Sequence, residues 1–148
     1  MRIPVQWVFV LAYLVGVVLQ AFLPIPMNAK IRQVAQTAGF ALLGAGAVLA
    51  TWCLMIFRRA RTTTIPLVTS STLVTWGSYR FSRNPMYVSL TLVYLGEAGV
   101  LGQVWPLILL SFGLAYINGT VMPFEEARLQ EKCDDSYQRY SATVRRWF

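Results

Sequence analysis

The chain has 148 residues, of which 56% are apolar and only 13% are charged, and its net charge is +7. Soluble domains average about 45–50% apolar and about 25% charged residues, so the composition argues against a soluble domain and indicates that lipid faces much of the surface. The basic residues lie between apolar blocks, a distribution that favours membrane lipids over nucleic acid as partners. The length fits one domain, expected to cover residues 1–148.

Four apolar blocks, taken in chain order, predict membrane-spanning helices. They cover about residues 5–23, 34–57, 85–101 and 104–122. A span needs roughly 20 apolar residues and must satisfy its backbone hydrogen bonds internally, so each block is expected to be an α-helix. Small residues between positions 39 and 47 suit close helix packing. The third block is short, and the Gly102-Gln103 turn after it predicts that the third and fourth blocks form a helical hairpin.

The basic residues predict the orientation in the membrane. The loop over residues 58–84 carries five arginines, the polar tail carries five more basic residues, and Arg2 precedes the first span. The opposite side has only Lys30 and Arg32. Lys and Arg are enriched in cytoplasmic segments. We therefore expect a multi-pass protein with both termini, the loop and the tail in the cytoplasm.

The tail over residues 124–148 has a different pattern from the spans. Its apolar residues between Ala127 and Tyr140 mostly recur at helical spacing among polar ones. Pro123 lies just before it, at a favoured helix-start position, and acidic residues follow. The pattern predicts an amphipathic helix at the membrane surface.

Histidine and cysteine usage narrows the chemistry. The chain has no histidine, the commonest general base and metal ligand. Cys53 and Cys133 are far apart and fit no metal-binding or redox spacing. We therefore expect no metal site and no disulfide framework.

Two polar segments, residues 72–87 and 123–129, are expected at the same cytoplasmic boundary. Each has an ordinary explanation by itself: arginines anchor the topology, tyrosines form an interfacial belt, and Glu125 and Glu126 complement a helix N-terminus. Together they bring carboxylates, guanidinium groups and aromatic rings to the edge of the membrane. The residue types alone therefore indicate a polar site whose purpose stays open.

Residues 73–87, LVTWGSYRFSRNPMY, resemble a signature of the isoprenylcysteine carboxyl methyltransferase and phospholipid methyltransferase families. Glu125-Glu126, followed by Leu129, two spaced tyrosines and the ending VRRW at residues 144–147, resembles the carboxyl-terminal motif of the same group. The resemblance covers about residues 57–148. It implies several membrane helices and methyl transfer from S-adenosylmethionine bound on the cytoplasmic side.

The resemblance also implies site residues. The implied cofactor-binding set is Thr72, Leu73, Val74, Tyr79, Asn84, Pro85, Met86, Tyr87, Glu125 and Glu126. The implied catalytic set is Arg83, Tyr87 and Glu125. These types suit the cofactor, because aromatic faces attract its cationic sulfonium and an arginine can bind its carboxylate. Methyl transfer depends on positioning and desolvation more than on acid–base groups, so it tolerates the lack of histidine.

The acceptor stays open among several classes. The leading hypothesis is a lipophilic or lipidated acceptor such as an isoprenylcysteine carboxylate, and the alternatives are a phospholipid amine, another lipophilic amine or thiol, or a non-catalytic scaffold. The sequence argues against a transporter, because the spans are few and only Glu97 and Asn118 within them are polar enough to suggest a pathway. Departures from the signature are Ser78, Asn84, Ser89 and Cys133-Asp134. Residues 118–122 also lack the arginine that many carboxyl-methylating members carry there.

Overall fold

The computed structural model describes residues 5–60 and 74–147, which are helical apart from short connections. In this part of the chain, three helical stretches are long and apolar enough to cross a membrane: α1 (Val5–Phe22), α2 (Ala29–Arg59) and the continuous stretch Val104–Glu131. The helix α3 (Pro85–Leu101) is also apolar but has only 17 residues. The predicted all-α membrane fold is confirmed.

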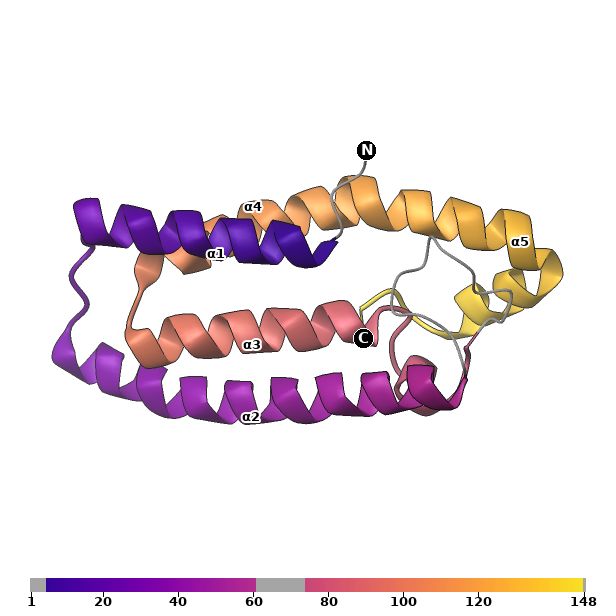
Figure 1. Cartoon of the computed structure of the whole chain (residues 1–148), viewed down its shortest axis with the longest axis horizontal. Helices are drawn as coiled ribbons and strands as arrows, with labels where there is room; N and C mark the ends of the chain where they lie inside the picture. Colours follow the sequence, from indigo (N-terminus) through magenta and orange to yellow (C-terminus); the bar gives the residue numbers. More distant parts are fainter. Residues whose placement is uncertain (1–4, 61–73, 148) are drawn as a thin grey trace.

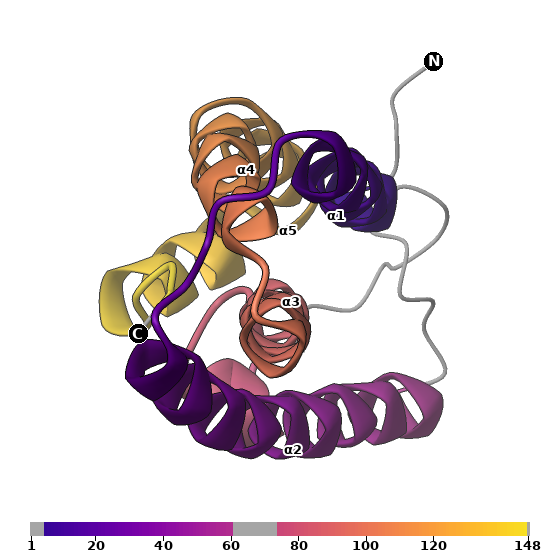
Figure 2. The same cartoon turned by 90° about the vertical axis from the view of Figure 1, so that its left-hand side faces the viewer.

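The helices run side by side along the long axis of the molecule (Figure 1). α2 packs against α3, and α1 packs against α4 (Val104–Tyr116). Viewed along the bundle, α3 lies between α2 and the α1–α4 pair (Figure 2). Gly102 ends α3 in the left-handed conformation, with φ of 64°, and its N–H bonds the carbonyls of Ala98 and Gly99. This connection between α3 and α4 is the predicted turn.

Glycines allow α2 and α3 to approach closely. A Cβ atom on Gly39 would lie 2.7 Å from the backbone nitrogen of Val100, and one on Gly46 would lie 2.9 Å from that of Val93. Gly44 instead has open space around it. The small residues of α2 therefore differ in role, and only those on the α3 side are required for packing.

A hydrophobic cluster fills the space between the helices and leads toward one end of the bundle. Its buried members are Val5, Phe9, Tyr87, Tyr94, Leu110, Ile117 and Met122. The Tyr94 ring meets the Tyr13 ring edge to face at 5.1 Å, and its hydroxyl donates to the Pro106 carbonyl at 2.9 Å. The outward faces carry large apolar side chains, with Phe40 65% exposed and Phe112 69% exposed. These faces suit contact with lipid chains.

The end of the fourth apolar block differs from expectation. α4 continues through a π-helical turn (Ile117–Val121) into α5 (Met122–Thr143), so the fourth predicted span and the predicted tail helix form one continuous helical stretch. The N–H of Met122 bonds the carbonyl of Ile117, five residues earlier. The wider π turn accommodates Pro123, which has no N–H to donate and occupies the first turn of α5.

Other bounds also shift. α2 begins at Ala29, five residues before the predicted 34, because the Asn28 side chain accepts from the Lys30 N–H at 3.0 Å and caps the helix. Within the predicted loop of residues 58–84, a 3₁₀ turn (η1) forms over Gly77–Arg80. The tail helix was expected to reach residue 148, but α5 ends at Thr143 and the backbone of Val144 is extended.

Candidate functional site

Four separate segments meet at one end of the bundle (Figure 1). They are η1 with the residues that follow it, the beginning of α3, the first turns of α5, and the chain end at residues 144–147. The Arg83 N–H donates to the Arg145 carbonyl at 3.0 Å. The Asn84 amide and the Ser82 hydroxyl both donate to the Arg146 carbonyl, at 3.2 and 3.3 Å. Residues 82–84 are therefore held by the last residues of the chain.

Tyr87 and Glu125 form the most direct contact in the site. The buried Tyr87 hydroxyl lies 2.8 Å from each carboxylate oxygen of Glu125 and donates its proton to that group. Tyr87 belongs to the first turn of α3 and Glu125 to the first turn of α5. A carboxylate held by one phenol retains free lone pairs, so Glu125 can accept hydrogen bonds from hydroxyl or ammonium groups of a ligand.

Glu126 has different partners from its neighbour. Its carboxylate receives a bidentate pair from Arg146, with Nε at 2.9 Å and Nη2 at 2.6 Å. The Arg83 Nη1 lies 3.2 Å from the same carboxylate and donates to the Tyr137 hydroxyl at 3.2 Å. The hydrogen bonds that Arg146 donates to Glu126 raise the pKa of the Arg146 guanidinium. Two arginines therefore neutralise Glu126, while Glu125 faces a tyrosine.

One donor in this cluster has no partner. Among the described residues, the buried Arg83 Nε makes no hydrogen bond. A buried unpaired donor costs free energy unless a ligand or water satisfies it. An acceptor group bound beside Arg83 would relieve this cost.

Tyr79 of the η1 turn and Tyr140 of α5 lie at the edge of the cluster. Gly77 has φ of 67°, a conformation that favours glycine, and a Cβ atom there would lie 2.5 Å from Ile56 Cδ1, so the Ile56 side chain would have to shift for any other residue. The Tyr79 carbonyl accepts from the Tyr140 hydroxyl at 2.7 Å. Burial raises the pKa of Tyr79 above its usual range and that of Tyr140 to about 12. Both rings therefore stay neutral at physiological pH.

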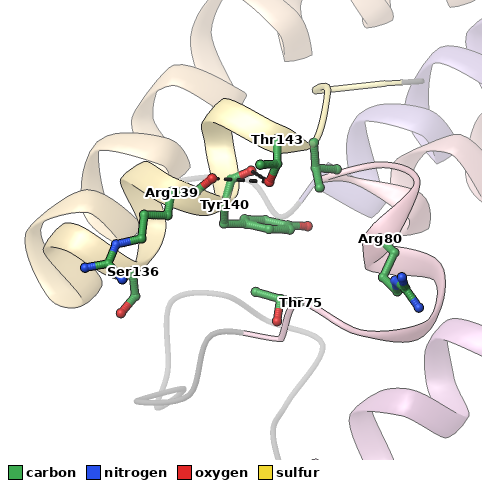
Figure 3. A pocket seen from close by; sticks show the side chains of 7 residues that line it. Thr75, Arg80, Ser136, Arg139, Tyr140 and Thr143 are labelled. Atoms are coloured by element: carbon green, nitrogen blue, oxygen red, sulfur yellow. Dashed lines mark hydrogen bonds between the residues drawn. The ribbon is translucent and has the colours of Figure 1, made fainter.

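An open pocket of about 530 Å³ lies beside the cluster (Figure 3). Its lining residues are Thr75, Arg80, Ser136, Arg139, Tyr140, Thr143 and Val144. In the close view, Arg80 and Arg139 flank opposite sides, with the Tyr140 ring between them. Tyr87 and Glu125 do not line this pocket. The pocket is thus adjacent to the tyrosine–glutamate pair, and its charged lining is entirely cationic.

The structure distributes the predicted site residues unevenly. Arg83, Tyr87, Glu125 and Glu126 come together, and the Asn84 side chain contacts the chain end. Val74 and Pro85 are buried, Tyr79 and Met86 are half-buried, and Thr72 and Leu73 lie outside the described residues. Sequence reasoning missed Arg146 and Tyr137 as parts of the cluster. Both fall within the quoted carboxyl-terminal motif, which was the available signal.

Two departures from the signature are accommodated inside the fold. Ser78 is 3% exposed, and its hydroxyl lies 3.4 Å from the Cys53 sulfur. Ser89 is fully buried and donates to the Met86 carbonyl at 2.7 Å. Both serines are therefore satisfied locally, away from the Tyr87–Glu125 pair.

Fold and site together define a helical membrane protein with a tyrosine, glutamate and arginine cluster at one end of its bundle. A family model described as phospholipid methyltransferase matches residues 34–135, which include most of α2, all of α3 and α4, and the Glu125-Glu126 pair. The chain belongs to the phospholipid methyltransferase family and is a membrane methyltransferase. No curated protein and no solved structure matches the chain.

Proposed function

We propose that the chain transfers a methyl group from S-adenosylmethionine to a lipophilic acceptor, and that the Tyr87–Glu125 pair is the centre of the cofactor site. The supporting observation is the contact of 2.8 Å between the Tyr87 hydroxyl and the Glu125 carboxylate, which forms no ion pair with an arginine in the described part of the chain. S-adenosylmethionine supplies an electrophilic methyl group on a cationic sulfur. A half-buried carboxylate and an aromatic ring attract that cation and the cofactor's hydroxyl or ammonium groups.

The residues present fit the cofactor in two further respects. The unpaired Arg83 Nε offers a donor to an acceptor group. The adjacent pocket has a volume within the range of about 300–1,000 Å³ that is usual for small-molecule sites, and Arg80 and Arg139 at its sides suit a carboxylate. We assign binding and orientation to these residues, since methyl transfer gains most from alignment and exclusion of water.

For the acceptor, we propose a phospholipid amine. The Glu125 carboxylate attracts a protonated amine and repels an acceptor carboxylate. The bound ammonium then loses its proton to water, and the freed nitrogen lone pair accepts the methyl group. The guanidinium groups of Arg83 and Arg146 are engaged by Glu126 and would have to leave it to neutralise an acceptor carboxylate. An isoprenylcysteine carboxylate is the second candidate, supported by the resemblance of the two motifs.

We also propose that this end of the bundle faces the cytoplasm and that membrane lipids are the working partners. The support is the basic residues of the loop and tail, including the exposed Arg58, Arg59 and Arg80. A polar cofactor then enters from water, while a lipophilic acceptor approaches from the bilayer.

Cofactor binding to purified protein in detergent tests the proposal. We expect saturable binding of S-adenosylmethionine, and Glu125→Gln should weaken it at least about tenfold, or about 1.4 kcal/mol. Glu131→Gln is the matched control, because Glu131 is an exposed carboxylate on the same helix. Absence of saturable binding by the wild-type chain at millimolar cofactor would overturn the enzyme assignment.

Labelled methyl transfer in liposomes then separates the acceptors. We expect label in a phosphatidylethanolamine-type lipid and none in a prenylcysteine analogue. Label in the prenylcysteine analogue alone would overturn the amine assignment and leave the methyltransferase assignment standing.

A further inference from the structure

The last residues of the chain return to the site instead of extending into solvent. In Figure 1 the segment after α5 runs back to the beginning of α3. Its backbone accepts from the Arg83 N–H at 3.0 Å and from the Asn84 amide at 3.2 Å. The Trp147 indole donates to Asn118 Oδ1 at 3.3 Å and packs against the hydrophobic cluster. The returning segment therefore touches α3, the π turn and residues 82–84 together.

Arg146 is the charged link in this return. Its guanidinium forms the bidentate pair with Glu126 and also reaches Asn118 Oδ1 at 3.4 Å. Its side chain is 32% exposed and that of Glu126 is 20% exposed, so solvent screens the pair only in part. Bidentate guanidinium–carboxylate pairs fix geometry as well as charge, because two parallel N–H donors set the relative orientation of both groups.

The two adjacent glutamates consequently have separate roles. Glu126 is occupied by guanidinium groups from Arg146 and Arg83, whereas Glu125 is held by the neutral phenol of Tyr87. Without the Arg146 side chain, Glu126 would keep its contact with Arg83 at 3.2 Å. The ion pair that joins residues 144–147 to α5 would be lost, and residues 82–84 would be held by a less firmly docked segment.

From this arrangement we infer that Arg146 is a positioning residue: it clamps the chain end onto Glu126 and thereby sets α5 and residues 82–84 so that Glu125 and Tyr87 meet in binding geometry. The functional half of the inference rests on the proposed cofactor site. Glu126 then serves the clamp, and cofactor contact falls to Glu125.

Hydrogen exchange tests the clamp without reference to activity. The Arg83 amide is the reporter, because its bond to the Arg145 carbonyl exists only while the chain end is docked. We expect Arg146→Ala to speed its exchange at least about tenfold. Arg145→Ala is the matched control, since it removes an exposed neighbouring guanidinium and keeps the carbonyl that Arg83 binds. Equal exchange in the two variants would overturn the clamp.

Kinetics test the positioning role. We expect Arg146→Ala to raise the KM for S-adenosylmethionine about tenfold while kcat changes less than about threefold, and Arg145→Ala to resemble wild type. Arg146→Lys keeps the positive charge but loses the bidentate guanidinium geometry, so its KM should lie between those of wild type and Arg146→Ala. If all three variants lose kcat and gain KM in proportion to their loss of thermal stability, Arg146 has a merely structural role and the inference is overturned.

Failure of this inference is distinguishable from failure of the proposed function. If the wild-type chain binds no S-adenosylmethionine, the proposed function fails, and the exchange experiment still decides whether the clamp exists. If wild type binds and Arg146→Ala binds equally well, the proposed function stands and the positioning role fails. Should Arg146→Ala not fold, Arg146→Lys and Glu126→Gln carry the same comparison.

Discussion

Tyr87 and Glu125 show how the site depends on pairing between distant residues. They are 38 positions apart, yet the phenol lies 2.8 Å from both carboxylate oxygens. The motifs named both residues, but they also named Glu126 beside Glu125 as a cofactor-binding residue. Only their neighbours distinguish the two glutamates, since one meets a tyrosine and the other meets two arginines. Adjacent identical residues cannot be separated by a sequence pattern that treats them alike.

At this scale we expect Tyr87→Phe to reduce S-adenosylmethionine affinity at least about tenfold, or about 1.4 kcal/mol. The change removes the donor that orients Glu125 and leaves a half-buried carboxylate without it, and a hydrogen bond to a charged group is worth about 1.5–3 kcal/mol. Equilibrium binding in detergent measures the effect.

The control is Tyr94→Phe. Tyr94 lies on the same helix, is 4% exposed and donates to the Pro106 carbonyl at 2.9 Å, away from Glu125. Equal loss of affinity in both variants would mean that the phenols act through stability alone and would contradict the assigned role of Tyr87.

Among the elements, the continuous helix from α4 to α5 differs most from the prediction of two separate helices. Pro123 followed by acidic residues indicated a new helix, because proline favours first turns. The π turn over Ile117–Val121 instead joins the two helices and absorbs the proline. Local rules identified a favourable helix start but carried no information about whether the preceding helix stops.

The α2–α3 interface yields a prediction at this scale. Gly39→Ala should lower the free energy of unfolding by about 1–3 kcal/mol, because its Cβ atom would lie 2.7 Å from the Val100 backbone nitrogen and the rigid helices would have to separate. Thermal unfolding in detergent measures the change.

Gly44→Ala is the matched control on the same helix. A Cβ atom on Gly44 would have no neighbour within 4 Å in the described part of the chain, and alanine is favoured over glycine in helices by about 1 kcal/mol. We expect this variant to be at least as stable as wild type. A loss of stability equal to that of Gly39→Ala would argue against close α2–α3 packing.

For the whole molecule, α3 is an apolar helix shorter than the three helical stretches of the described chain that are long enough to cross the bilayer. α3 has 17 residues, about 25 Å of helix, against a hydrocarbon core of about 30 Å. It is enclosed by α2 and the α1–α4 pair (Figure 2), so protein and not lipid surrounds much of its length. A short helix is tolerated there, because neighbouring helices cover its ends.

Cysteine labelling in oriented vesicles tests the arrangement. With four crossings, an impermeant maleimide should reach Cys133 from the cytoplasmic side and Lys30→Cys, placed in a Cys133→Ser chain, from the opposite side. Cys53 is fully buried and provides a slow internal background. Labelling of both positions from one side would mean that α3 does not cross and that the chain has three spans.

By itself the sequence determined that the chain is an all-α membrane protein, which family it belongs to, and which residues are candidates for the site. It could do so because the free energy of transfer into lipid is a sum over the residues of one contiguous segment, and because each motif is also contiguous in the sequence. The tertiary structure decided which candidates meet. Hydrogen-bond partners such as Tyr87 with Glu125, or Glu126 with Arg146, depend on helix register and on the return of residues 144–147. Those relations arise only when segments far apart in the chain pack together.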